Sequence, residues 1–260
     1  MKTERDGKTF GIPRSRRLSW DLLYFNQGVP LCGHSRWLDL GRVAELRKEA
    51  GVRISWPALF LKAFGLLAQQ YPELRQMWSR WPWARLYQHP GSVGILTVQR
   101  EFRGERWLFW GRIPMPEQLS LVEIQNRIDV YQTGAVEDQF KRELQLVALP
   151  TVFRRLIWAW NLHFSGAKRP KRLGTFFLSS LSGMGVEIQI PPSVQTCCLT
   201  YGPLSAEGKM KLTIAYDHRV MDGALIAECL CELERVFSET ITAELLKLRS
   251  DPTKMAPVTE

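Results

Sequence analysis

The chain has 260 residues, of which 45% are hydrophobic, so it can form one large domain with a substantial core. No stretch reaches the roughly 18 uninterrupted apolar residues of a membrane span, and the charged residues 1–8 do not resemble a secretory signal. The net charge of +9 favours acidic substrates, acidic carrier proteins or anionic lipid as partners, and no recognisable module indicates nucleic-acid binding.

Helices are predicted in the first quarter of the chain from the spacing of apolar residues. Residues 15–25 form the first, and residues 40–46 belong to a second that ends at Gly51. Residues 56–71 are apolar at nearly every position and carry Pro57 in the first turn, so they are expected to form a buried helix.

Two strands and another helix are predicted next. Residues 94–98 and 107–110 are typical of strands on either side of a turn at Arg103 and Gly104, and residues 119–131 of a helix. The fold class is therefore α/β, a large sheet covered by helices in two layers.

Residues 149–166 are rich in aromatic and aliphatic side chains, and the basic residues Lys168, Arg169, Lys171 and Arg172 follow at once. One interpretation is an amphipathic helix that lies at a membrane surface or covers a pocket for a long acyl chain. The other is a core helix followed by solvated basic side chains. The sequence leaves both open for this insertion, at residues 149–172.

A histidine stands between a strand and a helix near the end of the chain. Residues 211–216 alternate as in a half-buried strand, and the apolar residues from Leu225 to Phe237 recur on one helical face. His218 lies in the connection, where a neutral imidazole can accept a proton from an attacking group. Asp222 either caps the helix or holds an arginine and orients the turn.

Three segments carry a resemblance to a known family. His218 to Gly223, within Tyr-Asp-His-Arg-Val-Met-Asp-Gly, resembles the active-site signature of the dihydrolipoyl acyltransferase catalytic domains of 2-oxoacid dehydrogenase complexes, and chloramphenicol acetyltransferases have a related motif. Residues 174–181, Gly-Thr-Phe-Phe-Leu-Ser-Ser-Leu, and the following 190–199 are similar to two strands of that family. Residues 57–74 resemble its Pro-Glu-Leu helix. The segments occur in the family's order.

The resemblance implies a chloramphenicol acetyltransferase-like fold and an acyl transfer. His218 would be the general base that deprotonates the acceptor, and Ser179 would hydrogen-bond the oxyanion, without a covalent acyl-enzyme. Ser180 is the alternative hydroxyl. The resemblance also implies a homotrimer with the active site between subunits, and Arg16 or Arg17 as a partner for Asp222.

The expected donor is a coenzyme A thioester, an acyl carrier protein or an acyl-lipoyl group of another chain, because the family's own lipoyl and subunit-binding domains are not found in this sequence. The domain is expected at residues 12–245, between tails at 1–11 and 246–260.

No metal site is predicted. The five cysteines lack ligand spacing, and those in apolar segments, Cys197, Cys198 and Cys229, are expected to be buried thiols in a reducing cytoplasm. The other histidines, His34, His89 and His163, are far apart in the sequence and are expected in surface or loop positions.

Three functions therefore remain. The leading hypothesis is a thioester-dependent acyltransferase of the cytoplasm, free or peripheral at the membrane. The alternatives are a non-catalytic trimer or cage scaffold of the same fold and a peripheral lipid-binding protein that uses residues 149–172.

Overall fold

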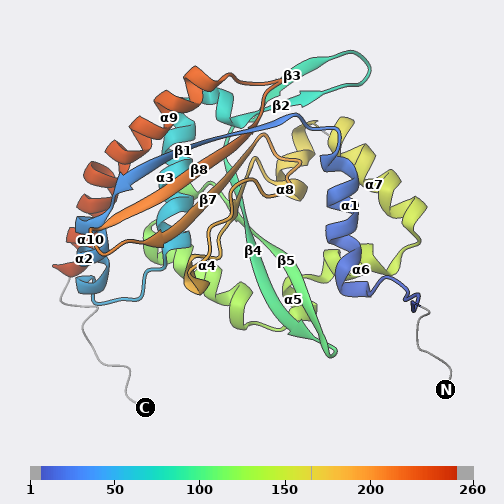
Figure 1. Ribbon diagram of the computed structural model, residues 1–260, viewed down its shortest axis with the longest axis horizontal. Coiled ribbons are helices and arrows are strands. Elements are labelled where there is room, and N and C mark those ends of the chain that lie inside the picture. Colours follow the sequence, from blue (N-terminus) through green and yellow to red (C-terminus); the bar gives the residue numbers. More distant parts are fainter. Residues whose placement is uncertain (1–6, 165, 251–260) are drawn as a thin grey trace.

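A six-stranded mixed sheet runs through the computed structural model, which describes residues 7–164 and 166–250 (Figure 1). The strand order is β1-β8-β7-β6-β4-β5, in which β6 is parallel to both β4 and β7 and all other neighbours are antiparallel. The strands are β1 (Leu31–Asp39), β4 (Val93–Phe102), β5 (Glu105–Pro114), β6 (Phe176–Ser179), β7 (Cys197–Leu204) and β8 (Lys209–Asp217). A separate hairpin contains β2 (Gln76–Ser79) and β3 (Arg85–Gln88).

One face of the sheet holds the main core. Alternate residues of the strands, such as Leu178, Leu199 and Ile214, are fully buried against the helices on this side. These helices are α2 (Gly41–Glu49), α3 (Trp56–Gln70), α4 (Leu121–Thr133), α9 (Gly223–Val236) and α10 (Thr242–Arg249), with the π-helical turn Phe237–Ile241 between the last two. Leu248 belongs to this core, so the domain extends past the expected end at residue 245.

The other face holds two smaller clusters. Its strand residues, including Ile95, Phe177 and Cys198, form a second small core with Trp110, and a third cluster lies nearby around Leu22 and Trp158 of two helices. The helices on this side and at the β5 edge are α1 (Arg17–Asn26), α5 (Val136–Gln139), α6 (Lys141–Ala148), α7 (Thr151–His163) and α8 (Arg169–Leu173) (Figure 1).

The predicted elements are confirmed with small shifts of their ends, and the α/β fold class with them. The helix expected at 56–71 is α3, the strands at 94–98 and 107–110 are the centres of β4 and β5, and the turn between them includes Arg103 and Gly104. None of the helices in residues 7–164 and 166–250 combines the length and the apolarity that a bilayer span requires.

The insertion at residues 149–172 matches neither interpretation fully. The inner face of α7 packs against the domain, with Arg154, Trp158 and Leu162 buried. Its outer face is apolar and exposed, with Val152, Phe153, Leu156, Ile157, Trp160 and Phe164 between 40% and 68% accessible. The basic run is not merely solvated, because Arg169 is buried and donates hydrogen bonds to the carbonyl oxygens of Leu162 and Val194.

Candidate active site

His218 begins the turn that connects β8 to α9. Its backbone N–H donates to the carbonyl oxygen of Pro30 at 3.1 Å, while its side chain is exposed. The ring of Tyr216 lies 5.5 Å from the imidazole between ring centroids and also 5.5 Å from the ring of His34 on β1. The backbone of His218 is therefore fixed, and its imidazole is open to a reactant.

Asp217 and Arg219 hold this turn in shape. Asp217 Oδ1 accepts a hydrogen bond from Arg219 Nε at 2.8 Å, and Asp217 Oδ2 accepts one from Arg219 Nη2 at 2.6 Å. The backbone N–H of Arg219 also donates to Asp217 Oδ1. Arg219 Nη1 donates to the carbonyl oxygen of Gly28, and its guanidinium lies 4.0 Å from the ring centroid of Trp78. Bidentate arginine–carboxylate pairs are strong and directional, so they restrict the conformations of the turn.

Asp222 is the N-cap of α9. Its Oδ1 accepts a hydrogen bond from the backbone N–H of Leu225 at 3.0 Å, which confirms the capping interpretation. The expectation that Arg16 or Arg17 pairs with Asp222 is not met within the chain: Arg17 Nη1 donates instead to the carbonyl oxygen of Val147 on α6. The aspartate that orients the turn through an arginine is Asp217.

Gly223, the last residue of the motif, lies close to the side chain of His34 on β1. A Cβ atom at this position would lie 3.0 Å from Nε2 of His34 and 3.5 Å from the hydroxyl of Tyr216. The Tyr216 hydroxyl is buried and has no hydrogen-bond partner in the described part of the chain. A larger residue at 223 would therefore displace the aromatic side chains beside His218.

Ser179 ends β6, and the neighbouring Ser180 is already engaged by its own surroundings. Ser180 Oγ donates to the carbonyl oxygen of Tyr201 at 2.9 Å and accepts from the backbone N–H of Ser182 at 3.1 Å. For Ser179 Oγ no such bond is found in residues 7–164 and 166–250, and the side chain is only partly buried. Ser179 is thus the serine of the pair whose hydroxyl is free to bind a reactant.

A row of hydroxyl side chains crosses the sheet at the level of Ser179. Ser179 is paired with Thr200 on β7, Thr200 with Thr213 on β8, and Thr213 with Ser35 on β1. Ser35 and Thr213 share a hydrogen bond of 2.7 Å between their hydroxyl oxygens. The row was missed at the sequence level because strand order and register decide which residues become neighbours.

A single chain does not bring His218 and Ser179 together. Ser179 is level with Thr213, whereas His218 lies five residues further along β8 and two strands away. With a rise of about 3.3 Å per residue and about 4.8 Å between strands, the two Cα atoms are about 19 Å apart. For both side chains to hydrogen-bond one reacting group, His218 Nε2 and Ser179 Oγ would have to lie within about 6 Å of each other, which even with fully extended side chains allows no more than about 15 Å between the Cα atoms.

A cavity of about 460 Å³ lies beside the His218 turn. Its wall contains Arg80, Arg169 and Arg219 as well as Asp217 and the aromatic ring of Trp78. Burial lowers the pKa of Arg169 to about 10, and this arginine remains cationic at neutral pH. The cavity therefore offers a positive surface to an anionic group next to the histidine.

The other predicted histidine and cysteine positions are partly confirmed. His34 is exposed, but His89, although in a loop, is buried, and burial lowers its pKa to about 4. Cys197, Cys198 and Cys229 are buried as predicted, and burial raises the pKa of Cys229 to about 12. The described residues contain no group of three or more ligand side chains that could hold a metal ion.

Solved structures share the fold, although no protein-family model and no curated sequence matches the chain. A structure of Azotobacter vinelandii dihydrolipoamide acetyltransferase, in which the catalytic roles of a serine, a histidine and an asparagine were investigated, has a TM-score of 0.65 at 19% identity, over 94% of this chain and 97% of that one.

Two further solved structures share the fold. The cubic core of the pyruvate dehydrogenase multienzyme complex has a TM-score of 0.64 at 20% identity, over 94% of this chain and 97% of that one. A truncated catalytic core of the 2-oxoacid dehydrogenase multienzyme complex from Thermoplasma acidophilum has a TM-score of 0.63 at 17% identity, over 90% and 99%. The fold of the chain is therefore that of the acyltransferase cores, as the resemblance in the sequence implied.

Proposed function

We propose that the chain is an acyltransferase that moves an acyl group from a thioester donor to an acceptor. The observation that carries the proposal is the exposed imidazole of His218 on a restrained strand-to-helix turn. This turn occurs in a fold similar to acetyltransferase cores over almost the whole chain. The free hydroxyl of Ser179 supports the same chemistry.

His218 would act as general base. It takes the proton from the thiol, hydroxyl or amine of the acceptor as that heteroatom forms a bond to the thioester carbonyl carbon. The carbonyl oxygen becomes an oxyanion, to which the Ser179 hydroxyl donates a hydrogen bond. Collapse of the tetrahedral intermediate breaks the carbon–sulfur bond, and the leaving thiolate takes the proton back from the imidazolium. No acyl-enzyme forms.

The active site would lie between subunits of a homotrimer. The separation of about 19 Å within one chain supports this arrangement, because His218 of one subunit can then work with Ser179 of another. Asp222 would act by capping α9 and fixing where the turn ends.

The donor would be acidic, with coenzyme A, an acyl carrier protein or an acyl-lipoyl group of another chain as the carrier. The net charge of +9 and the arginines around the 460 Å³ cavity support an anionic carrier, since they attract phosphate and carboxylate groups. No metal takes part in the proposed steps.

The test compares His218→Ala, Ser179→Ala and the matched control Ser180→Ala in the assembled protein. The reaction is followed by mass spectrometry with acyl-coenzyme A donors of increasing chain length and with amine and thiol acceptors. Loss of the base should lower kcat by about 10²–10⁴. Loss of the oxyanion donor should lower it by about 10²–10³, with Ser180→Ala much closer to the unaltered protein.

Full activity of His218→Ala would contradict the proposal. If the unaltered protein transfers no acyl group at all but forms a large assembly by light scattering, the scaffold alternative is favoured instead.

A second candidate function, binding to an anionic lipid surface, is favoured by the outer face of α7. Trp20 and Tyr24 of α1, which are 46% and 49% accessible, add exposed aromatic area where Arg155 of α7 lies over their rings. Arg155, Lys168 and Lys171 supply positive charge around them. Apolar side chains flanked by cations are typical of helices that lie in the membrane interface.

Co-sedimentation with vesicles of anionic lipid tests this function. Phe153→Ser with Trp160→Ser should abolish binding, and the control Trp37→Ser, on the exposed side of β1, should not. No sedimentation of the unaltered protein with anionic vesicles would remove the candidate.

A further inference from the structure

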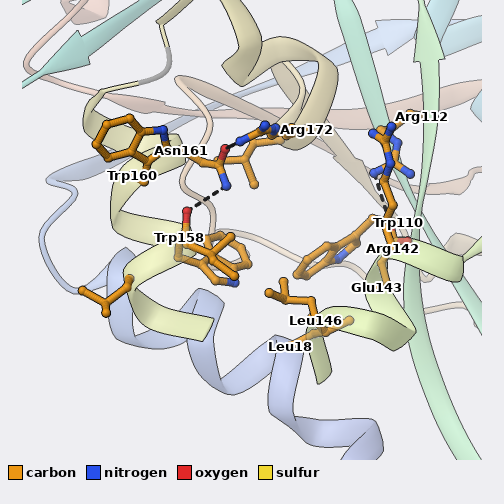
Figure 2. Close-up of a pocket in the computed structure, with 13 residues that line it drawn as sticks. Leu18, Trp110, Arg112, Arg142, Glu143, Leu146, Trp158, Trp160, Asn161 and Arg172 are labelled. Carbon is orange, nitrogen blue, oxygen red and sulfur yellow. Dashed lines mark hydrogen bonds and ion pairs between the residues drawn. The ribbon is translucent and has the colours of Figure 1, made fainter. Parts of the chain in front are cut away.

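A second cavity lies away from His218, between the β5 edge of the sheet and the helices α1, α6, α7 and α8. Its volume is about 820 Å³, within the range of about 300–1,000 Å³ that small-molecule sites occupy. Figure 2 shows the side chains that surround it, and the insertion at 149–172 supplies one whole wall. Four strand spacings, about 19 Å, separate β5 from β8.

The walls of the cavity are mainly apolar. Trp110 of β5 and Trp158 of α7 meet edge to face, with ring centroids 5.9 Å apart. The remaining apolar side chains come from four helices: Leu18, Leu146, Leu156, Ile157, Trp160 and Leu173. Such a surface favours an aliphatic or aromatic body, because its burial removes apolar area from water on both partners.

Positive charge is concentrated at one side of the same cavity. Arg112, Arg142 and Arg172 line it against a single carboxylate, Glu143. Arg112 Nη1 pairs with Glu143 Oε1 at 3.1 Å, and Arg172 donates to Asn161 Oδ1 (Figure 2). For Arg142 no ion pair or hydrogen bond is found in residues 7–164 and 166–250. Arg142 and the remaining N–H donors of Arg172 are therefore available to bind an anionic group.

Two buried donors in the walls lack partners. Trp158 is 3% accessible, and its indole N–H, like that of Trp110, has no hydrogen-bond partner in the described part of the chain. Both indole nitrogens have almost no accessible surface, so the two rings face the cavity with their apolar carbon atoms.

We infer that this cavity binds an amphipathic organic carboxylate. The apolar body of the ligand lies against Trp110, Trp158 and Leu146, and its carboxylate binds the guanidinium groups of Arg142 and Arg172. Arginine recognises carboxylates through paired N–H donors, which gives the ligand its orientation. The inference does not rest on the proposed acyl transfer, since neither His218 nor Ser179 lines this cavity.

Tryptophan fluorescence and isothermal titration calorimetry on the whole protein test the inference. The probes are octanoate, decanoate and dodecanoate, and decanol is the uncharged control. Saturable binding that strengthens with chain length is expected, with decanol about tenfold weaker than decanoate or more. Arg142→Gln should weaken the binding of decanoate by a similar factor. The control Arg42→Gln, which changes an exposed arginine on α2, should leave this binding unchanged.

Two more variants distinguish binding in this cavity from binding elsewhere on the protein. Leu146→Trp, which narrows the apolar part of the cavity, should weaken decanoate binding, whereas His218→Ala should bind decanoate as the unaltered protein does. The inference is overturned if no carboxylate binds saturably, if decanol binds as well as decanoate, or if Arg142→Gln and Leu146→Trp both bind normally.

Discussion

At the scale of single residues, the restraint on His218 comes from its neighbours rather than from the imidazole itself. Asp217 fixes Arg219, Arg219 reaches Gly28 and Trp78, and the backbone of His218 is bonded to Pro30. A base that is held in position needs little reorganisation when it takes a proton, which is one source of the rate gain from general-base catalysis.

His89 should make the stability of the fold depend on pH. Burial is the largest cause of its lowered pKa of about 4, and the nearby Arg169 and Arg75 add to it. The unfolded chain, with an ordinary histidine pKa of about 6.5, binds the proton first, so stability is complete above that pH and is lost as the pH falls toward 4.

The free energy of unfolding in urea, measured between pH 7 and pH 4, checks this effect. His89→Gln should show a shallower decline over this window than the unaltered protein, because the residue no longer takes up a proton on unfolding. Equal slopes for the two proteins would show that His89 does not contribute.

The sequence offered His218, Ser179 and Asp222 as candidates, because each occurs in a short contiguous motif that resembles the family's. It could not separate the two roles suggested for Asp222, since capping depends on where α9 begins. The role of Asp217 could not be predicted either. Its pairing with Arg219 depends on the conformation of the turn, and the bond from Arg219 to Gly28 depends on the tertiary structure.

At the scale of elements, α7 is attached to α1 by a buried ion pair. Arg154 Nε lies 2.6 Å from Asp21 Oδ2, and the two side chains are 2% and 0% accessible. Arg155 approaches the same carboxylate and stacks over Tyr24 at 3.8 Å. These contacts hold the inner face of α7 in place and leave its outer apolar face exposed.

Asp21→Ala should therefore destabilise the protein strongly. It leaves the guanidinium of Arg154 buried without its counter-ion, a change that costs about 3–5 kcal/mol in the free energy of unfolding. Glu49→Ala is the matched control, because its pair with Arg249 is about half exposed on both sides and should contribute less than about 1 kcal/mol.

Urea denaturation of the two variants gives the comparison. Similar small losses in both would show that the Asp21–Arg154 pair does not hold α7 to the domain.

Helices and strands with regular apolar spacing were predictable from the sequence, α3 and β4 among them. The segment at 149–172 was not, because its spacing indicates an amphipathic helix without saying which of its faces meets the domain. The burial of Arg154 and Arg169 inside a basic, aromatic stretch depends on Asp21 and on the carbonyl groups of Leu162 and Val194, which only the tertiary structure supplies.

At the scale of the whole molecule, the sheet separates the two proposed catalytic residues. Ser179 ends β6 level with the middle of β8, whereas His218 lies just beyond the end of β8. The motif order in the sequence carries no information about this separation, which follows from strand direction and register. Under the proposed function, their cooperation would therefore take place between two copies of the chain.

Subunit mixing tests this central claim most directly. His218→Ala and Ser179→Ala proteins are each expected to be nearly inactive in acyl transfer from acyl-coenzyme A, because every site in each assembly lacks one residue. After dissociation, mixing and reassembly, some interfaces combine an intact His218 with an intact Ser179, and a substantial fraction of the activity should return. If subunit exchange is verified by mass spectrometry and no activity returns, the two residues do not act together across a subunit interface.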